Sequence, residues 1–422
     1  MANTLFLANT GTSNIDIDNF FIPRSITIFG DTVVNEGSFG AGQTYYWGMN
    51  DSGQFGDGTS TSTQISIPTY VKNYNPSNRW GWYSVCYSSL AVASDGTLWA
   101  WGSNINGALG DGTVVNKSSP VQIGNLNNWL LVKNNSYSSG TSPLTMAITS
   151  DGKMWAWGTN GTYQVGDGFN IHRSSPVQVG ALVQWKNIFP LGGGSALAIR
   201  SESGGGTTLW GWGNNGAGEL GIGATGNQSS PVVVGSSGPW LAGSTVTQVA
   251  GGNQHWLALT SGLDNNSGPL WTCGSNSNGQ MGINSSTSNF SVVQQIGALV
   301  NWSFVAAGPL NSASIKNDGT LWTWGNNANG ELGQNVATAN ISSPIQVGLL
   351  TTWKRVLPGQ SFMVATKTDG TLWGWGNGYR VGDGSGVNKS SPVQIATSFS
   401  NKWRLPSYMG SNSNTVFAIL PG

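Results

Sequence analysis

The sequence predicts an all-β protein, a seven-bladed β-propeller, from three observations. A Trp-x-Trp-Gly motif and its variants occur seven times, at intervals of 51 to 61 residues. Glycine accounts for 63 of the 422 residues, which indicates many tight turns. Apolar and polar residues alternate with a period of two, and no helical period is sustained. Units of about 50 residues that each supply four short strands are typical of propeller blades.

The motif itself forms a buried strand, the Trp strand. Its seven copies end at Gly48, Gly102, Gly158, Gly213, Gly274, Gly325 and Gly376. In the second copy, Trp99 and Trp101 share one face of the strand while Leu98 and Ala100 share the other. Because both faces are apolar, we expect this strand, and the Trp residues that recur in it, in the core of each blade.

Three further strands recur around the Trp strand. An Asn- and Gly-rich loop such as 103–113 follows it, and then a Ser-Ser-Pro-Val-Gln strand such as 118–124. A strand that begins at a Trp comes next, as at Trp129, and the unit closes with a short apolar strand such as 144–149. In four units an Asp-Gly pair joins the apolar strand to the next Trp strand, and this pair favours a two-residue type I′ hairpin turn.

The order of these strands at the two ends of the chain predicts a closed ring. The last unit finishes with an apolar strand at 416–419, and the first begins with the Trp strand at 45–48. Pairing the two completes a shared blade and leaves no exposed sheet edge. We therefore expect an N-terminal extension over 1–43 and a seven-bladed propeller over 44–422.

The charge composition argues against several classes of function. The chain has 17 basic and 17 acidic residues and a formal net charge of zero. Nucleic-acid binding needs a cationic surplus, and an anionic membrane surface would find little to attract. The sequence contains neither an apolar run of membrane-spanning length nor the pattern of a secretory signal. We expect no nucleic-acid partner, no membrane insertion and synthesis in a cytoplasm.

Residues that catalyse reactions or bind metals are scarce. The two histidines, His172 and His255, and the two cysteines, Cys86 and Cys273, do not make a zinc-ligand set. We expect both thiols to be buried and reduced. Acidic residues mostly occupy Gly-Asp-Gly turns, as at Asp111, where Asp accepts backbone hydrogen bonds. These observations predict a protein that is not an enzyme, with no catalytic residue, no metal site and no cofactor.

Two candidate binding sites stand outside the regular repeat. Phe20, Phe21 and Ile22 form an apolar cluster ahead of a predicted hairpin at 25–34. Because exposed apolar clusters mark interaction sites, we interpret them as an anchor to another subunit, with docking on the chain's own propeller as the alternative. The second site is an aromatic patch on the rim, for which core packing is the alternative. Its members are Tyr70, Tyr74, Trp80, Trp82, Tyr83 and Tyr87.

The repeat resembles that of the regulator-of-chromosome-condensation family. The family unit reads approximately Asp-Gly, apolar-Trp-x-Trp-Gly-x-Asn, x-x-Gly-x-Leu-Gly-x-Gly, then Ser-Pro-x-x-Val, and residues 95–123 follow it closely. The resemblance extends over the chain from residue 44 onward and implies a seven-bladed propeller. The family's founding member is a chromatin-bound guanine-nucleotide exchange factor for a small GTPase, and other members are binding modules, including a secreted bacterial enzyme inhibitor. Such a shared fold is compatible with many functions.

Composition and architecture together favour a structural protein of a virus particle. Low charge, abundant Gly, Asn, Ser and Thr, and a short head outside the repeat are typical of bacteriophage virion proteins, and the chain resembles propellers found among them. We hypothesise a component of the tail, fibre or capsid exterior, made in the host cytoplasm and present in several copies. Its partners would be other virion structural proteins or, in host attachment, a host-surface receptor. The alternatives are a cytoplasmic protein-binding scaffold or inhibitor and an exchange factor, although residues 1–43 hold a single basic residue, Arg24, in place of a basic tail.

Overall fold

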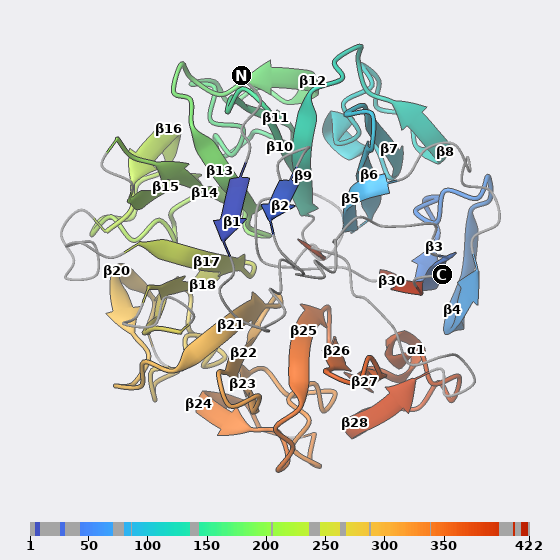
Figure 1. Cartoon of the computed structure of the whole chain (residues 1–422), viewed down its shortest axis with the longest axis vertical. Helices are drawn as coiled ribbons and strands as arrows, with labels where there is room; N and C mark the ends of the chain where they lie inside the picture. The colour runs from blue at the N-terminus through green and yellow to red at the C-terminus, as the bar shows by residue number, and fades with distance from the viewer. Residues whose placement is uncertain are drawn as a thin grey trace.

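The computed structural model shows antiparallel sheets arranged around a common axis, with the first strand of each four-stranded sheet near the axis and the last at the rim (Figure 1). It describes residues 5–8, 26–29, 43–70, 80–85, 87–135, 143–203, 206–235, 245–261, 267–286, 288–337, 339–395, 408–409 and 415–420. Within these residues, only a 3-10 turn (Ile105–Gly107) and the four-residue helix α1 (Gly378–Val381) are helical. The prediction of an all-β propeller fold is confirmed.

Five sheets have four antiparallel strands each, in chain order from axis to rim, and the Trp strand is the third in every one. The first two sheets are β9 (Trp129–Asn135), β10 (Leu144–Thr149), β11 (Met154–Gly158) and β12 (Arg173–Gln178), and β13 (Trp185–Pro190), β14 (Ser195–Ser201), β15 (Thr207–Gly213) and β16 (Gln228–Val233). The next three are β17 (Val246–Gly251), β18 (His255–Thr260), β19 (Leu270–Gly274) and β20 (Phe290–Gln295); β21 (Trp302–Ala307), β22 (Asn311–Lys316), β23 (Leu321–Gly325) and β24 (Ile341–Gln346); and β25 (Trp353–Gly359), β26 (Phe362–Lys367), β27 (Leu372–Gly376) and β28 (Lys389–Ile395).

Two further sheets contain strands from both ends of the chain. One has the order β29 (Tyr408–Met409), β5 (Trp80–Val85), β6 (Ser88–Ala93), β7 (Leu98–Gly102) and β8 (Lys117–Gln122), and the other the order β30 (Thr415–Leu420), β3 (Gln43–Asn50) and β4 (Thr61–Tyr70). The strand β30 pairs antiparallel with β3, so that Trp47 lies opposite Val416. By contrast, β29 pairs in parallel with β5, with Tyr408 opposite Ser84.

The N-terminal segment contains a pair of parallel strands. Residues of β2 (Ile26–Phe29) pair in parallel with β1 (Leu5–Ala8), so that Leu5 lies opposite Ile26. A parallel pair needs a long connection, and residues 9–25 supply one. Residues 32–34, the other half of the predicted hairpin, lie outside the described residues.

The Asp-Gly turns also differ in type from the prediction. The amide of Gly96 donates to the Ala93 carbonyl at 2.9 Å, and the amide of Ala93 donates to the Thr97 carbonyl at 2.8 Å. Gly96 has a φ of +83°, whereas Asp95 is not among the residues with positive φ. This is a longer loop, a type I turn followed by a left-handed glycine, instead of a two-residue type I′ turn. The Asp95 carboxylate favours it by accepting hydrogen bonds from the amide and hydroxyl of Thr97 at 2.9 and 2.6 Å.

Buried indoles join neighbouring sheets. In seven sheets one fully buried Trp donates its Nε1 hydrogen to a backbone carbonyl in the loop of the preceding sheet, at 2.7 to 3.1 Å. The pairs are Trp47 with Arg380, Trp101 with Gln54, Trp157 with Ala108, Trp212 with Gln164, Trp256 with Glu219, Trp324 with Gln280, and Trp375 with Glu331. Each link combines a large apolar surface with a satisfied buried donor, so the links stabilise the contacts between sheets.

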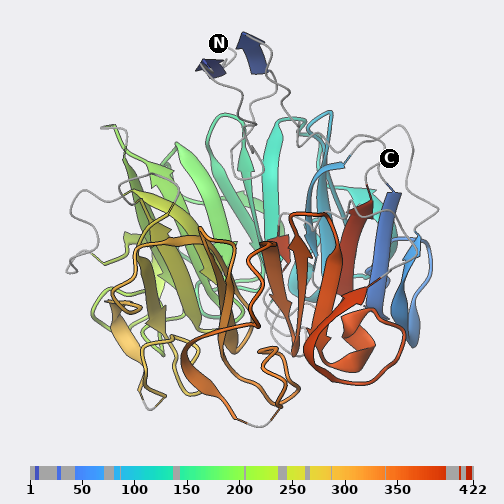
Figure 2. The ribbon, with the colours of Figure 1, turned by 60° about the horizontal axis from the view of Figure 1, so that its bottom comes forward.

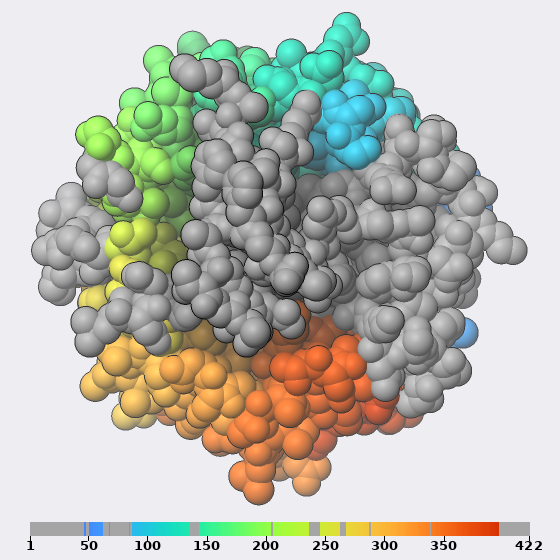
Figure 3. All heavy atoms as spheres, viewed as in Figure 1, coloured from blue at the N-terminus to red at the C-terminus, as the bar shows by residue number. Residues whose placement is uncertain are grey.

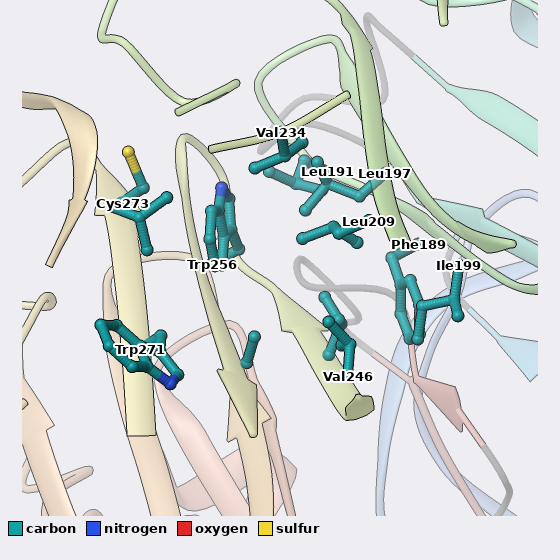
Figure 4. Packing of buried hydrophobic residues seen from close by; sticks show 13 residues of the cluster. Phe189, Leu191, Leu197, Ile199, Leu209, Val234, Val246, Trp256, Trp271 and Cys273 are labelled. Carbon is teal, nitrogen blue, oxygen red and sulfur yellow. The ribbon is translucent and has the colours of Figure 1, made fainter. Parts of the chain in front are cut away.

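One of the seven links uses a different strand. Six of these Trp residues lie on Trp strands, but Trp256 lies on β18, directly opposite Cys273 of the Trp strand β19. In the next sheet the opposed pair is Ser312 and Trp324. The indole and the small side chain have therefore exchanged strands, and Trp256 fills the space that the missing Trp leaves. Figure 4 shows Trp256 between the strand of Cys273 and the apolar side chains of the preceding sheet, all in one buried cluster.

Candidate protein-binding surface

The structure describes little of the two predicted binding sites. Phe20, Phe21, Ile22 and Tyr74 lie outside the described residues. The structure gives only the backbone of Tyr70 on β4 and of Trp80, Trp82 and Tyr83 on β5, and these strands belong to different sheets. Trp80 pairs with Ala93 in the register in which Trp302 pairs with Lys316, so it belongs to the repeat pattern. Tyr87 is half-buried.

The ring has two faces with different kinds of connection. Successive strands of a sheet run in opposite directions, so the connections alternate between the two faces of the ring. One face, the turn face, holds the turn between the second and third strands of each sheet and the connection to the next sheet. The other face, the loop face, holds the loops that follow the first strand and the third strand of each sheet. The helix α1, in a loop after a Trp strand, lies at the opposite end of the ring from β1 and β2 (Figure 2), which places those two strands on the side of the turn face.

Buried Asn side chains organise the loops on the loop face. The Oδ1 atom of Asn104 accepts from the Leu109 amide at 2.9 Å, and its Nδ2 atom donates to the Thr113 carbonyl at 3.1 Å. The same two kinds of bond recur at Asn50, Asn160, Asn215, Asn276 and Asn327. All six side chains are at most 1% exposed, so their hydrogen-bonding groups serve the loops themselves.

Charged groups on the loop face are paired within the chain. Lys117 lies 3.4 Å from the Asp111 carboxylate, and Arg173 and Lys389 pair in the same way with Asp167 and Asp383. Asp111 also accepts from the Thr113 amide at 2.9 Å, as predicted for a turn aspartate. Burial raises the pKa of Asp111, but the hydrogen bonds from Thr113 outweigh it and hold the pKa below its usual range.

The turn face exposes apolar side chains at the connections between sheets. Leu349 is 92% exposed, and the other members are between 38% and 58% exposed. We call this set the leucine crown: Leu126, Leu182, Val183, Leu299, Val300, Leu349 and Leu350. The set recurs at four of the connections between sheets, with two adjacent apolar residues in three of them. The face is seen in Figure 3, where residues 300–370 appear in orange at the lower edge.

Two lysines on the turn face lie over Trp pairs. The Nζ atom of Lys316 is 3.7 Å from the ring centroid of Trp322 and 5.0 Å from that of Trp302. Lys367 has the same position in the next sheet, 3.5 Å from the Trp373 ring. Burial lowers the pKa of both ammonium groups. The cation–π contacts offset part of the cost of burying these charges.

These lysines distinguish two sheets from the others. The corresponding residues elsewhere are Ala93, Thr149, Arg200 and Thr260. Arg200 pairs with Glu202 at 2.9 Å, whereas Lys316 and Lys367 form no ion pair with any residue in the described part of the chain. Each of the two lysines interacts electrostatically with the aspartate two residues further along, Asp318 or Asp369, although neither forms a close ion pair with it.

A pocket of about 460 Å³ lies between those two sheets on the turn face. Lys316, Asp318 and Gly319 line it from the first sheet, and Thr351, Trp353 and Lys354 from the second. It is an open depression in the surface and not an enclosed cavity.

Sequence reasoning missed this surface for two different reasons. The crown residues recur in the segments GNLNNW, GALVQW, GALVNW and GLLTTW, so their spacing was a usable signal. Lys316 and Lys367 have no such signal, because only the strand register places each lysine beside two Trp rings.

Burial shifts the pKa of several titratable groups, and it lowers that of Lys133 to about 7. Burial lowers the pKa of His255 to about 3 and raises that of the Cys273 thiol to about 12. His255 Nε2 lies 3.0 Å from the Ser312 hydroxyl. No group of three or more His, Cys, Asp or Glu that could hold a metal ion occurs in the described residues. None of the helices in that part of the chain is both long and apolar enough to cross a bilayer.

Comparison with known proteins finds one repeat family. A model of the regulator of chromosome condensation (RCC1) repeat matches residues 95–133, 208–259 and 318–365, and a second model of this repeat matches 302–331. The chain is 30% identical over 374 residues to the mitochondrial RCC1 domain-containing protein RUG3 of Arabidopsis thaliana, covering 83% of this chain and 77% of that one. It is 26% identical to the ultraviolet-B receptor UVR8 of the same plant, covering 73% and 67%. The human E3 ubiquitin-protein ligase HERC2 is 27% identical over 73% of this chain, which corresponds to 6% of its own length.

Solved structures share the fold. Human WBSCR16 superposes with a TM-score of 0.75 at 18% identity, covering 91% of this chain and all of that one. Yeast RCC1 (Prp20), in a crystal with Kap60 bound, superposes with a TM-score of 0.71 at 19% identity, covering 90% and 89%. At such identities the likeness concerns the fold alone.

Proposed function

We propose, since the chain belongs to the regulator of chromosome condensation (RCC1) repeat family, that it is a non-enzymatic propeller that binds a partner protein on its turn face. The leucine crown is the observation that carries this proposal. Burying one large apolar side chain contributes about 1.5–3 kcal/mol, so four neighbouring members would supply a substantial interface core.

The distribution of charge favours the turn face over the loop face. The loop face exposes apolar side chains to a similar extent, with Val114, Val115, Phe169 and Ile171 59–65% exposed, so apolar exposure alone does not distinguish the faces. The aspartates of the loop face, however, are paired with nearby cations. On the turn face, Lys316 and Lys367 form no close ion pair with the described residues, and each has only a weaker electrostatic interaction with Asp318 or Asp369. Charge complementarity with a partner is therefore available on that face.

We further propose that the partner is another structural protein of a virus particle. The low charge, the abundance of small polar residues and the rigid ring support a display or docking role. The N-terminal extension, with Phe20, Phe21 and Ile22, would anchor the ring, and β1 and β2 stand on the same side as the crown (Figure 2). The alternative is a cellular protein-binding scaffold, which is favoured by the curated relatives named above, since they come from plants and mammals.

The proposal includes a closed ring of seven blades, with 44–422 as one domain. The pairing of β30 with β3 and the bond from Trp47 to the Arg380 carbonyl support this closure. A closed ring would keep the crown residues of separate sheets at fixed distances from one another, as a rigid docking surface requires.

A matched pair of variants tests the docking face. Leu349→Asp places a charge in the crown, and Val115→Asp places one at a 62%-exposed site on the loop face. Mass spectrometry of purified particles, and of complexes captured from infected or expressing cells, identifies the partner and measures its recovery. We expect Leu349→Asp to abolish recovery and Val115→Asp to preserve it. Equal recovery with the two variants would contradict docking on the turn face.

A further inference from the structure

We propose that the pocket between the sheets β21–β24 and β25–β28 binds the carboxylate of a single Asp or Glu side chain in an otherwise apolar segment of the partner. This inference rests on the proposed protein-binding function and specifies the chemistry of the partner. It assigns a recognition role to Lys316, Lys354 and Trp353.

The walls of the pocket come from equivalent parts of two repeats. Lys316 and the turn 317–319 form one side, and Thr351, Trp353 and Lys354 form the other. The floor of the site is rigid, because Lys316 is 8% exposed and its ammonium is held over Trp322, while Trp353 is 3% exposed. A charged group fixed in this way needs no reorganisation to meet an anion, which favours binding.

The charge of the lining fits a monoanion. Two lysines and one aspartate line the pocket. Asp318 accepts from the amide and hydroxyl of Thr320 through its Oδ1 atom, at 2.9 and 2.6 Å, and it also interacts electrostatically with Lys316. The two lysines and Asp318 together carry a formal charge of +1, so one carboxylate balances the lining, whereas the second charge of a phosphate would have no counter-charge there.

The lining of the pocket also contains a buried hydrogen-bond donor. The Nε1 hydrogen of Trp353 has no hydrogen-bond partner among the described residues, and the indole lines the pocket. An unsatisfied buried donor costs about 1–3 kcal/mol. The equivalent indoles of Trp129 and Trp302 lack a partner as well, so this donor recurs in the repeat, and an incoming oxygen atom would reach it only if neighbouring side chains moved aside. The hydroxyl of Thr351 lies on the same wall as a further donor.

The surroundings of the pocket define the rest of the ligand. Leu349 and Leu350 immediately precede Thr351, and Leu299 and Val300 occupy the equivalent connection of the neighbouring repeat. These four crown residues would bury apolar side chains on either side of the acidic residue. The pocket therefore fits an acidic residue flanked by leucine-like residues.

Two blocked pentapeptides test the inference: acetyl-Gly-Leu-Glu-Leu-Gly-amide and the same peptide with Gln in place of Glu. Binding is followed in ¹H–¹⁵N spectra of the full chain through the indole cross-peak of Trp353, which is assigned by its absence in Trp353→Phe. We expect the Glu peptide to shift this cross-peak saturably and the Gln peptide to bind about tenfold more weakly. Binding of the Glu peptide should also weaken as salt is raised, because the pocket is open to solvent.

Variants identify the lysines responsible. Lys316→Met and Lys354→Met should each weaken the Glu peptide about tenfold. Lys186→Met is the matched control, because Lys186 follows Trp185 as Lys354 follows Trp353, and it should leave binding unchanged. Lys354 is exposed, so its variant keeps the test valid if the Lys316 variant fails to fold.

Several outcomes would overturn the inference: equal binding of both peptides, no saturable shift with either, or displacement by inorganic phosphate below the concentration at which the Glu peptide binds. These failures are distinguishable from failure of the docking proposal. If Leu349→Asp still abolishes partner recovery while the Glu peptide shows no preference, the partner binds the turn face without inserting a carboxylate.

Discussion

The exchanged pair Trp256 and Cys273 predicts that two individually damaging substitutions compensate each other. In the next sheet, Ser312 and Trp324 both donate to the Gln280 carbonyl, at 2.8 and 2.9 Å. The double variant W256S/C273W recreates that arrangement opposite the Glu219 carbonyl, which now accepts from Trp256 at 2.7 Å.

The single substitutions should each lower the free energy of unfolding. W256S removes a fully buried indole from the cluster of Figure 4 and should cost about 3–5 kcal/mol. C273W adds an indole to a site already filled by Trp256 and should cost about 1–3 kcal/mol. In the double variant the volumes balance again, so we expect stability within about 1 kcal/mol of the parent and a coupling free energy of at least about 3 kcal/mol.

Denaturant unfolding of the four proteins, followed by tryptophan fluorescence and circular dichroism, measures the cycle. The reciprocal exchange T145W/W157C in a regular sheet is the matched control, since Thr145 lies opposite Trp157 and both donate to the Ala108 carbonyl. The argument is that the one buried indole of a sheet can come from either of the two strands. It would be refuted if the losses of unfolding free energy were additive in W256S/C273W and also in T145W/W157C.

Four further predictions concern other parts of the chain. Deleting 411–422 removes β30 and exposes the edge of β3, so unfolding should lose cooperativity and the protein should aggregate; a melting temperature within about two degrees of the parent would contradict closure. Deleting 1–40, or making Phe21→Asp, should leave the melting temperature unchanged but reduce partner recovery, whereas self-docking predicts a loss of stability. Cys273 should react slowly with a thiol reagent in the native state and rapidly after unfolding, because burial raises its pKa to about 12; fast native labelling would place it on the surface. Burial also raises the pKa of the Glu219 carboxyl above its ordinary value of 4.5, so the folded state holds the proton more strongly than the unfolded state and the stability of the protein falls as pH rises above 4.5. E219Q should therefore stabilise the protein at pH 7 and leave its stability unchanged below pH 4. Denaturant unfolding at the two pH values measures the difference.

The sequence was sufficient to predict the repeat and its four kinds of strand, because alternation and punctuation are local properties. In the sequence, Cys273 occupies the position at which the other copies of the motif have their last Trp. Trp256 was not identified from the sequence as the replacement, because the two residues are opposed only through the register of β18 and β19. The turn at Asp95 was assigned the wrong type, because the carboxylate of Asp95 bonds to Thr97 and favours a longer loop.

The candidate site was less predictable than the fold. The motif's first Trp, as at Trp322, was expected in the core, yet in five sheets it is half-buried beside the turn face. It forms edge-to-face pairs with the Trp of the first strand, for example Trp302 with Trp322 at 6.0 Å. Whether a residue at this depth is core or surface depends on the side chain that covers it, here Lys316, which lies on the second strand of the sheet, β22.

The circle of indole links has a consequence for how the chain could be cut and rejoined. The link from Trp47 to Arg380 has the same chemistry as the link from Trp101 to Gln54, although its partners lie 333 residues apart in sequence instead of 47. The hydrogen bond between neighbouring sheets is therefore the same whether the two sheets are adjacent in sequence or come from opposite ends of the chain. A circular permutant opened at the turn of Asp151 and Gly152, with the present ends joined by a linker, would keep all seven links. The order of the sheets in the sequence could thus be changed without changing their order around the axis.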